Sequence, residues 1–230
     1  MTSTIATPRH APVVATDPTT SRRWAVAGVF AGLAGIVSMV GSSLAGAVYE
    51  DDIAGDAVAI TDRLSEQVPQ ILVFHVATMV SALLMVVFAA GLRRQLIHRV
   101  GADSLLPSVA SSGLLLVAAV QVMGAGLTTE FVFGVSDPDL MVPEAAAFFG
   151  HWIGTIPWLW GAIGLTALSV AVAAFRHGAY ARWIGVTSLL LGGLATVFAV
   201  SPLQYMAGMV GPLWLTVAAL GLLFSRHGRR

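Results

Sequence analysis

The sequence predicts an all-α polytopic membrane protein, a bundle of six transmembrane helices with both termini in the cytoplasm. Three observations lead to this fold class. First, the chain of 230 residues is 57% hydrophobic and 10% charged, with a mean hydropathy of +0.83, whereas soluble domains keep about a quarter of their residues charged. Second, six apolar runs of bilayer-spanning length follow one another. Third, basic and acidic residues alternate between the segments that connect these runs.

Each apolar run is long enough to cross a bilayer, which takes about 20 residues. Because backbone amides that face lipid need partners within their own segment, each run is expected to be helical. The predicted transmembrane domain covers residues 24–225, with helices at about 24–48, 71–92, 105–127, 148–175, 183–200 and 205–224. Residues 1–23 are interpreted as a disordered cytoplasmic tail and residues 226–230 as a basic cytoplasmic tail.

The end of the first run resembles a signal-peptidase site, since Ser43 to Ala47 contains an Ala-x-Ala sequence. The apolar core of a signal peptide is about 7–15 residues long. The first run is longer than that, so we expect the first helix to be retained. A cleaved chain would have one helix fewer and the same orientation.

The distribution of charge predicts the orientation, because cytoplasmic loops of membrane proteins are enriched in arginine. The tails and the second and fourth connections hold every arginine but one, namely Arg9, Arg22, Arg23, Arg93, Arg94, Arg99, Arg176, Arg182, Arg226, Arg229 and Arg230. The first and third connections hold most carboxylates, namely Glu50, Asp51, Asp52, Asp56, Asp62, Glu66, Glu130, Asp137, Asp139 and Glu144. Only Arg63, Asp17 and Asp103 depart from this pattern. We therefore predict a multi-pass protein of the plasma membrane, with both termini cytoplasmic and the acidic connections outside.

The first outer connection has a helical pattern of its own. Between residues 56 and 68, apolar side chains recur at helical spacing, at Ala57, Ile60, Leu64 and Val68. This pattern predicts a short amphipathic helix on the outer surface. A solvated loop is the alternative. In the third connection, residues 137–138 predict a turn, and Pro143 suits the first turn of the next helix.

The first apolar run carries a stripe of small residues that includes Gly28, Gly32 and Gly35. Lipid provides no hydrophobic force between helices, so close packing at small residues holds such helices together. The stripe predicts packing within the bundle. A homo-oligomer formed through the same glycines is the alternative.

Few polar side chains lie within the predicted spans, and these are the candidate ligand-binding residues. Gln121 lies near the middle of the third span, and Glu130 follows nine residues later, on the opposite helix face at 100° per residue. His151, Thr155 and Trp158 share one face of the fourth span, which is expected to point inward.

Two alternatives give these residues a specific role. His75 and His151, at similar predicted depth, could ligate a haem iron from both sides in a redox membrane protein, or join Glu130 around a divalent metal. Pro157 and Pro212 lie about two turns from the outer ends of their helices, and such paired interruptions can mark the binding site of a transporter. Each histidine could instead be satisfied by water or a headgroup, and proline is common in membrane helices.

Composition excludes several functions. The chain has no cysteine and no lysine, which removes disulfides, thiolate chemistry and Schiff-base chemistry. A net charge of zero gives no reason to expect a nucleic-acid partner. The sequence favours a non-enzymatic protein of the lipid bilayer, without a cofactor, that binds a lipid-like or small apolar ligand, or a membrane partner, in the outer half of the bundle.

One segment resembles a recurring joint of a known family. Phe175 to Gly185 reads Phe-Arg-His-Gly-Ala-Tyr-Ala-Arg-Trp-Ile-Gly, similar to the Arg-x-Gly-x-x-Pro-Arg-Trp-Leu-Gly of the bacterial, actinobacterial-type six-helix membrane proteins called domain of unknown function four-three-eight-six. Here Ala181 replaces the proline and Ile184 the leucine. The segments 91–94 and 211–214 look similar too. The resemblance implies the six-helix architecture and no catalytic residues.

Overall fold

The computed structural model describes residues 22–224, and this part of the chain is helical, without a strand. The predicted tails lie outside the described residues except for Arg22 and Arg23. The elements are α1 (Arg23–Leu44), η1 (Ala47–Tyr49), α2 (Ala57–Glu66), α3 (Val68–Val100), α4 (Leu106–Val135), η2 (Pro138–Leu140), α5 (Pro143–Thr155), η3 (Ile156–Trp160), α6 (Ile163–His177), α7 (Arg182–Ala199), η4 (Gln204–Met206) and α8 (Ala207–Phe224). Six helical segments of this region are long and apolar enough to cross a membrane, as predicted.

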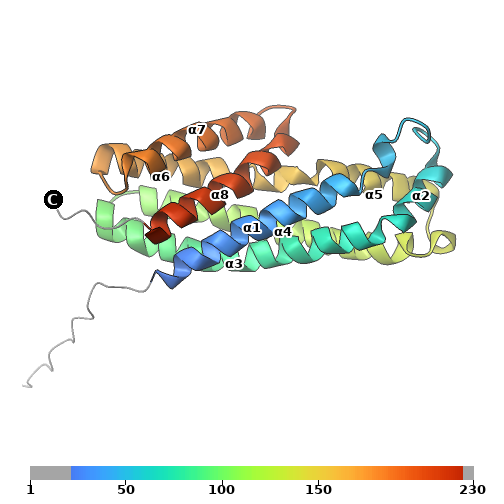
Figure 1. Ribbon diagram of the computed structural model, residues 1–230, viewed down its shortest axis with the longest axis horizontal. Helices are drawn as coiled ribbons and strands as arrows, with labels where there is room; N and C mark the ends of the chain where they lie inside the picture. The colour runs from blue at the N-terminus through green and yellow to red at the C-terminus, as the bar shows by residue number, and fades with distance from the viewer. Residues whose placement is uncertain (1–21, 225–230) are drawn as a thin grey trace, which may run out of the picture.

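The helices form an elongated bundle (Figure 1). Helix α1 packs against α3 and α8, α4 lies between α3 and α6, and α7 packs against α6 and α8. The start of α1, the end of α8 and the turns α3–α4 and α6–α7 lie at one end, while α2, η1 and the turn between α4 and α5 lie at the other (Figure 1). The described arginines other than Arg63 therefore gather at the first end, and the described carboxylates other than Asp103 gather at the second.

The bundle contains two separate hydrophobic clusters. The larger one runs through the spans and includes Phe88 and Trp214. The smaller one lies at the acidic end, where α2, η1 and α5 meet the first turn of α3 and the last turns of α4. We call this region the cap. Its buried members are Ala45, Ala47, Val48, Ile60, Leu64, Ile71, Val132, Val135, Ala146, Phe149 and Ile153.

Three spans are longer than their apolar runs predict. Helix α3 continues to Val100 instead of ending at 92, α4 continues to Val135 instead of 127, and α5 begins at Pro143 instead of 148. The added turns bury side chains such as Leu96 and Val135 against neighbouring helices. In these three helices, tertiary burial therefore carries the helix past the end of its apolar run. The first helix is shorter than predicted, because the chain leaves α1 at Leu44 to form η1.

The predicted amphipathic helix is confirmed as α2, and the alternative of a solvated loop is wrong. The carboxylate of Asp56 caps its start by accepting from the amides of Val58 and Ala59 at 3.0 and 3.1 Å. The apolar face, Ile60 and Leu64, is buried in the cap, where α2 packs against α5. The helix therefore packs on protein through this face.

The glycine stripe of α1 is buried inside the bundle. A Cβ added at Gly28 would clash with Phe88 of α3, and one added at Gly32 would lie 2.7 Å from the backbone nitrogen of Thr216 in α8. Gly35 meets Trp160 in the same way. Packing within the bundle thus occupies the stripe, and oligomerisation through it would require α8 to leave.

The joint between α6 and α7 is fixed to α3. Gly178 ends α6 in the left-handed region with φ 59°, which favours glycine because it has no Cβ. The buried Tyr180 donates a hydrogen bond to Gln95 at 3.2 Å. Arg99 donates to the carbonyl of Ala179, and its guanidinium lies 5.4 Å from the centre of the Tyr180 ring. These contacts hold the turn between α6 and α7 against the last turns of α3.

Candidate functional site

The two prolines predicted as a pair differ in their effect on the helix. Pro157 lies in η3, where the fourth span changes from α5 to a 3₁₀ segment before α6 begins at Ile163. Pro212 lies inside the continuous helix α8. Both are packed closely, since a Cβ at Gly208 would clash with Pro157 and one at Gly35 would lie 3.0 Å from Pro212. Of the two prolines, only Pro157 therefore coincides with an interruption of the α-helix.

Gln121 and Glu130 face opposite ways on α4, as the sequence predicts. Gln121 is 1% exposed, and its Oε1 has no hydrogen-bond partner. Glu130 is exposed. The two side chains therefore cannot line one pocket.

His75 and His151 lie on different helices, α3 and α5, and differ in burial. His75 is half-buried on α3, with its Nδ1 buried and unpartnered. His151 is exposed on α5, and its ring packs edge-on against Tyr49 at 5.7 Å and 83°. Helix α3 packs on α1 and α4, whereas α5 packs on α2 and α4. Between residues 22 and 224 no three His, Asp or Glu side chains are grouped as a metal site requires, so the trio with Glu130 is not assembled.

The predicted inward face of the fourth span is wrong for its first two members. His151 and Thr155 are exposed, and the Thr155 hydroxyl donates to the carbonyl of His151 at 2.8 Å. Helix α5 instead turns Phe149 and Ile153 into the cap core. Trp158 is half-buried and meets Trp152 edge-on at 5.9 Å.

Trp160 is a site residue that the sequence analysis missed. It is 0% exposed, and its indole Nε1 has no partner. The ring is enclosed by two glycines, Gly35 of α1 and Gly211 of α8. An apolar aromatic run gives no sign of an unpaired donor. The available signal was a second tryptophan three residues after Pro157, in the interrupted part of the fourth span.

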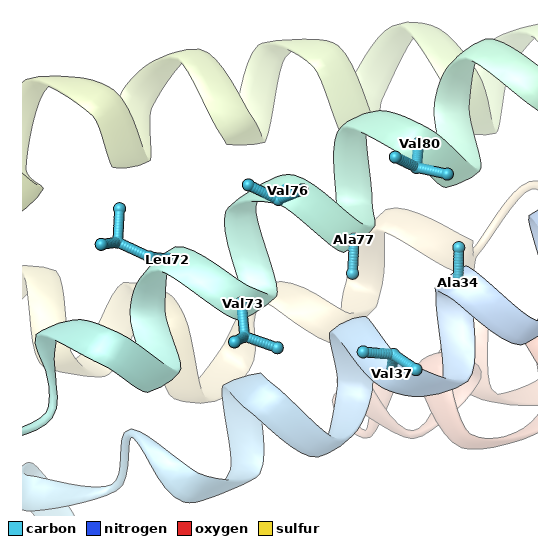
Figure 2. A pocket seen from close by; sticks show the side chains of 7 residues that line it. All are labelled: Ala34, Val37, Leu72, Val73, Val76, Ala77 and Val80. Atoms are coloured by element: carbon cyan, nitrogen blue, oxygen red, sulfur yellow. The ribbon is translucent and has the colours of Figure 1, made fainter.

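An apolar groove runs between α1 and α3 on the outer face of the bundle (Figure 2). Its volume is about 490 Å³. In Figure 2, Ala34 points towards α3, while Val73 and Ala77 point towards α1. The lining is entirely hydrophobic and consists of Ala34, Val37, Leu72, Val73, Val76, Ala77 and Val80.

A buried hydrogen bond holds α1 and α3 together next to the groove. The hydroxyls of Ser38 and Thr78 share a hydrogen bond of 2.6 Å that joins α1 to α3, and both side chains are buried. Beside them the alanines 34 and 77 leave space that longer side chains would fill. The groove depends on the register of two helices, which the hydropathy of a single segment does not encode.

Charged and polar side chains join the segments of the cap to one another. Arg63 forms ion pairs with Glu50 at 2.9 Å and with Glu66 at 2.6 Å. Gln67 accepts a hydrogen bond from the amide of Ala47 at 3.2 Å, which ties η1 to the start of α3. Burial, and then the nearby Tyr205, raises the pKa of Tyr49 in η1 above its usual range. These groups hold the cap together and do not line the groove.

No protein-family model, no curated protein and no solved structure matches this chain. The resemblance of residues 175–185 to the six-helix bacterial family stays a prediction.

Proposed function

We propose that this is a non-enzymatic integral protein of the plasma membrane that holds the acyl chain of a lipid-like molecule in the groove between α1 and α3. The observation that carries the proposal is the groove itself, whose seven lining residues are all apolar. An acyl chain offers only CH₂ groups, so a lining without hydrogen-bonding side chains suits it. Each CH₂ group removed from water contributes about 0.8 kcal/mol to binding. A chain that enters the groove from lipid has already left water, so the groove itself contributes mainly van der Waals packing.

The depth of the groove supports a ligand from one leaflet. Residues 72–80 belong to the half of the apolar run of α3 that lies nearest the cap. The groove therefore faces the leaflet on the acidic side of the bundle. The valines that form its walls are stiff at χ1, so they offer a preformed surface for a chain.

We propose that the arginine-rich end of the bundle and both termini lie in the cytoplasm. The separation of arginine and carboxylate to opposite ends of the bundle supports this, because arginine-rich ends stay inside. The cysteine-free chain allows a direct test. Asp52→Cys and His177→Cys replace exposed residues at the two ends. We expect a membrane-impermeant maleimide to label Asp52→Cys in intact cells, and His177→Cys only after lysis. The reverse pattern would contradict the orientation.

Occupancy of the groove is tested with a photoactivatable fatty acid in vesicles that contain the purified protein. We expect cross-links to map to residues 34–37 and 72–80. Ala77→Phe should fill the groove and remove these cross-links. Leu83→Phe is the matched control, because Leu83 lies on α3, 62% exposed and outside the lining. Equal labelling of all exposed apolar helix faces, unchanged in Ala77→Phe, would sink the proposal.

A further inference from the structure

Two buried polar atoms in the middle of the bundle lack hydrogen-bond partners and are chemical complements. The Oε1 of Gln121 accepts hydrogen bonds, and the Nε1 of Trp160 donates one. Gln121 is 1% exposed and Trp160 is 0% exposed, and neither atom has a partner. Buried polar atoms in proteins are nearly always satisfied by protein or by ordered water. This pair therefore calls for a third group.

The two residues lie at the same level of the bundle. Helix α4 packs against the span formed by η3 and α6. A Cβ added at Gly124 would lie 3.2 Å from Leu159, and one added at Gly113 would lie 3.1 Å from the carbonyl of Ala162. Gln121 is one turn from Gly124 and on the same buried face of α4. This register places Gln121 level with the 159–160 stretch.

The indole of Trp160 is held with little freedom to turn. Its Cζ2, on the edge of the ring next to the N–H, lies over Gly35 of α1, and its Cβ side lies against Gly211 of α8. The N–H is consequently directed to the α1 side of the ring, inside the bundle. The 3₁₀ segment η3 ends at this residue, so the donor sits where the fourth span is interrupted.

We propose that Gln121 and Trp160 form an internal binding site for one neutral hydroxyl group. A hydroxyl accepts from the indole N–H through its oxygen and donates its own hydrogen to the carboxamide oxygen, so it satisfies both atoms at once. The guest is neutral because, in the described chain, the apolar stretches of α1, α4, α6 and α8 carry no charged side chain that could pair with an ion. Its oxygen belongs either to a bound water or to an organic alcohol. This site is separate from the α1–α3 groove and does not depend on the acyl-chain proposal.

The test uses the full-length protein in lipid nanodiscs with ¹⁵N-labelled tryptophan. The Trp160 N–H signal is identified by its loss in Trp160→Phe. We expect a magnetisation-transfer cross-peak between Trp160 N–H and a bound hydroxyl, and its loss in Gln121→Leu. The matched control is Trp214, whose N–H already donates to the hydroxyl of Ser188 at 3.0 Å; any cross-peak from that hydroxyl, and the Trp214 signal itself, should be unchanged in Gln121→Leu.

Titration with 1-butanol separates the two sources of the hydroxyl. A saturable shift of the Trp160 signal in the wild-type protein, absent in Gln121→Leu, would identify an organic alcohol as the guest. A cross-peak to water that butanol does not change would identify a bound water. The proposal is overturned if the wild-type protein shows neither signal, or if the cross-peak persists in Gln121→Leu. The wild-type measurement decides the matter even if the Gln121 variant does not fold.

Discussion

The indole N–H of Trp214 donates a hydrogen bond to the hydroxyl of Ser188 at 3.0 Å, and both side chains are buried. The bond joins α8 to α7, the most weakly buried of the spans. Ser188→Ala would leave the indole donor without a partner. We expect a loss of about 1–3 kcal/mol in the free energy of unfolding, measured by denaturant titration in detergent. Ser43→Ala is the control, because the exposed Ser43 bonds only to the Met39 carbonyl of its own helix.

Close approach of α1 to α8 predicts that Gly32 tolerates no side chain. A Cβ at this position would meet the backbone of α8 at Thr216 and Pro212, at 2.7 and 3.0 Å. Gly32→Ala should therefore force the helices apart and destabilise the protein by about 1–3 kcal/mol. Gly126→Ala on α4 is the matched variant, since nothing lies within 4 Å of its added Cβ; higher helix propensity should leave it neutral or about 0.5–1 kcal/mol more stable. Equal effects of the two variants would show that α1 and α8 do not pack this closely.

The cap has a core of its own, and Leu64 is central to it with 0% exposure. Leu64→Ala should cost about 2–5 kcal/mol locally. Hydrogen exchange measured by mass spectrometry should then show faster exchange in α2 and α5, with the core of α1 and α8 unchanged. Val58→Ala on the exposed face of α2 should change neither region. Faster exchange throughout the bundle would mean that the cap and the spans unfold as one unit.

The buried Tyr180 predicts that the free energy of unfolding falls at alkaline pH. Burial raises the pKa of this phenol, although the nearby Arg99 opposes the shift. The folded pKa lies above the unfolded value of about 10, so the stabilising contribution is complete below pH 10 and is lost as the pH rises above it. Of the three tyrosines in the chain, we expect one to stay protonated until the protein unfolds. Absorbance at 295 nm checks this, and Tyr180→Phe should remove the late-titrating component. Three tyrosines that all ionise before unfolding would contradict the burial of Tyr180.

The six long apolar helices were predicted well because their length and hydropathy are set by local composition. The number and order of the six apolar helices, and the amphipathic helix with Ile60 and Leu64, are properties of short segments. Helix ends at Val100 and Val135 were missed because they depend on which neighbour covers the last turns. The cap was missed for the same reason, since its core joins residues as distant in sequence as Val48 and Phe149.

The candidate site could be predicted only in part. Polarity within an apolar run singled out Gln121, and the nine-residue spacing correctly set it apart from Glu130. The inward face predicted for His151 and Thr155 failed because α5 turns a different face to α2 and α4. The groove and Trp160 depend on helix register and on neighbours such as Gly35, which hydropathy does not encode.

For the membrane location proposed above, the short length of α7 sets the bilayer thickness that would suit this protein. Its 18 residues rise about 27 Å at 1.5 Å each, whereas the 33 residues of α3 rise about 50 Å. Bilayers have hydrocarbon cores of about 30 Å, with thinner and thicker variants among organelles and species. A thicker bilayer must become thinner beside the turn between α7 and α8, while the longer helices on the opposite side impose no such deformation. The protein would therefore impose a tapered bilayer profile around its circumference.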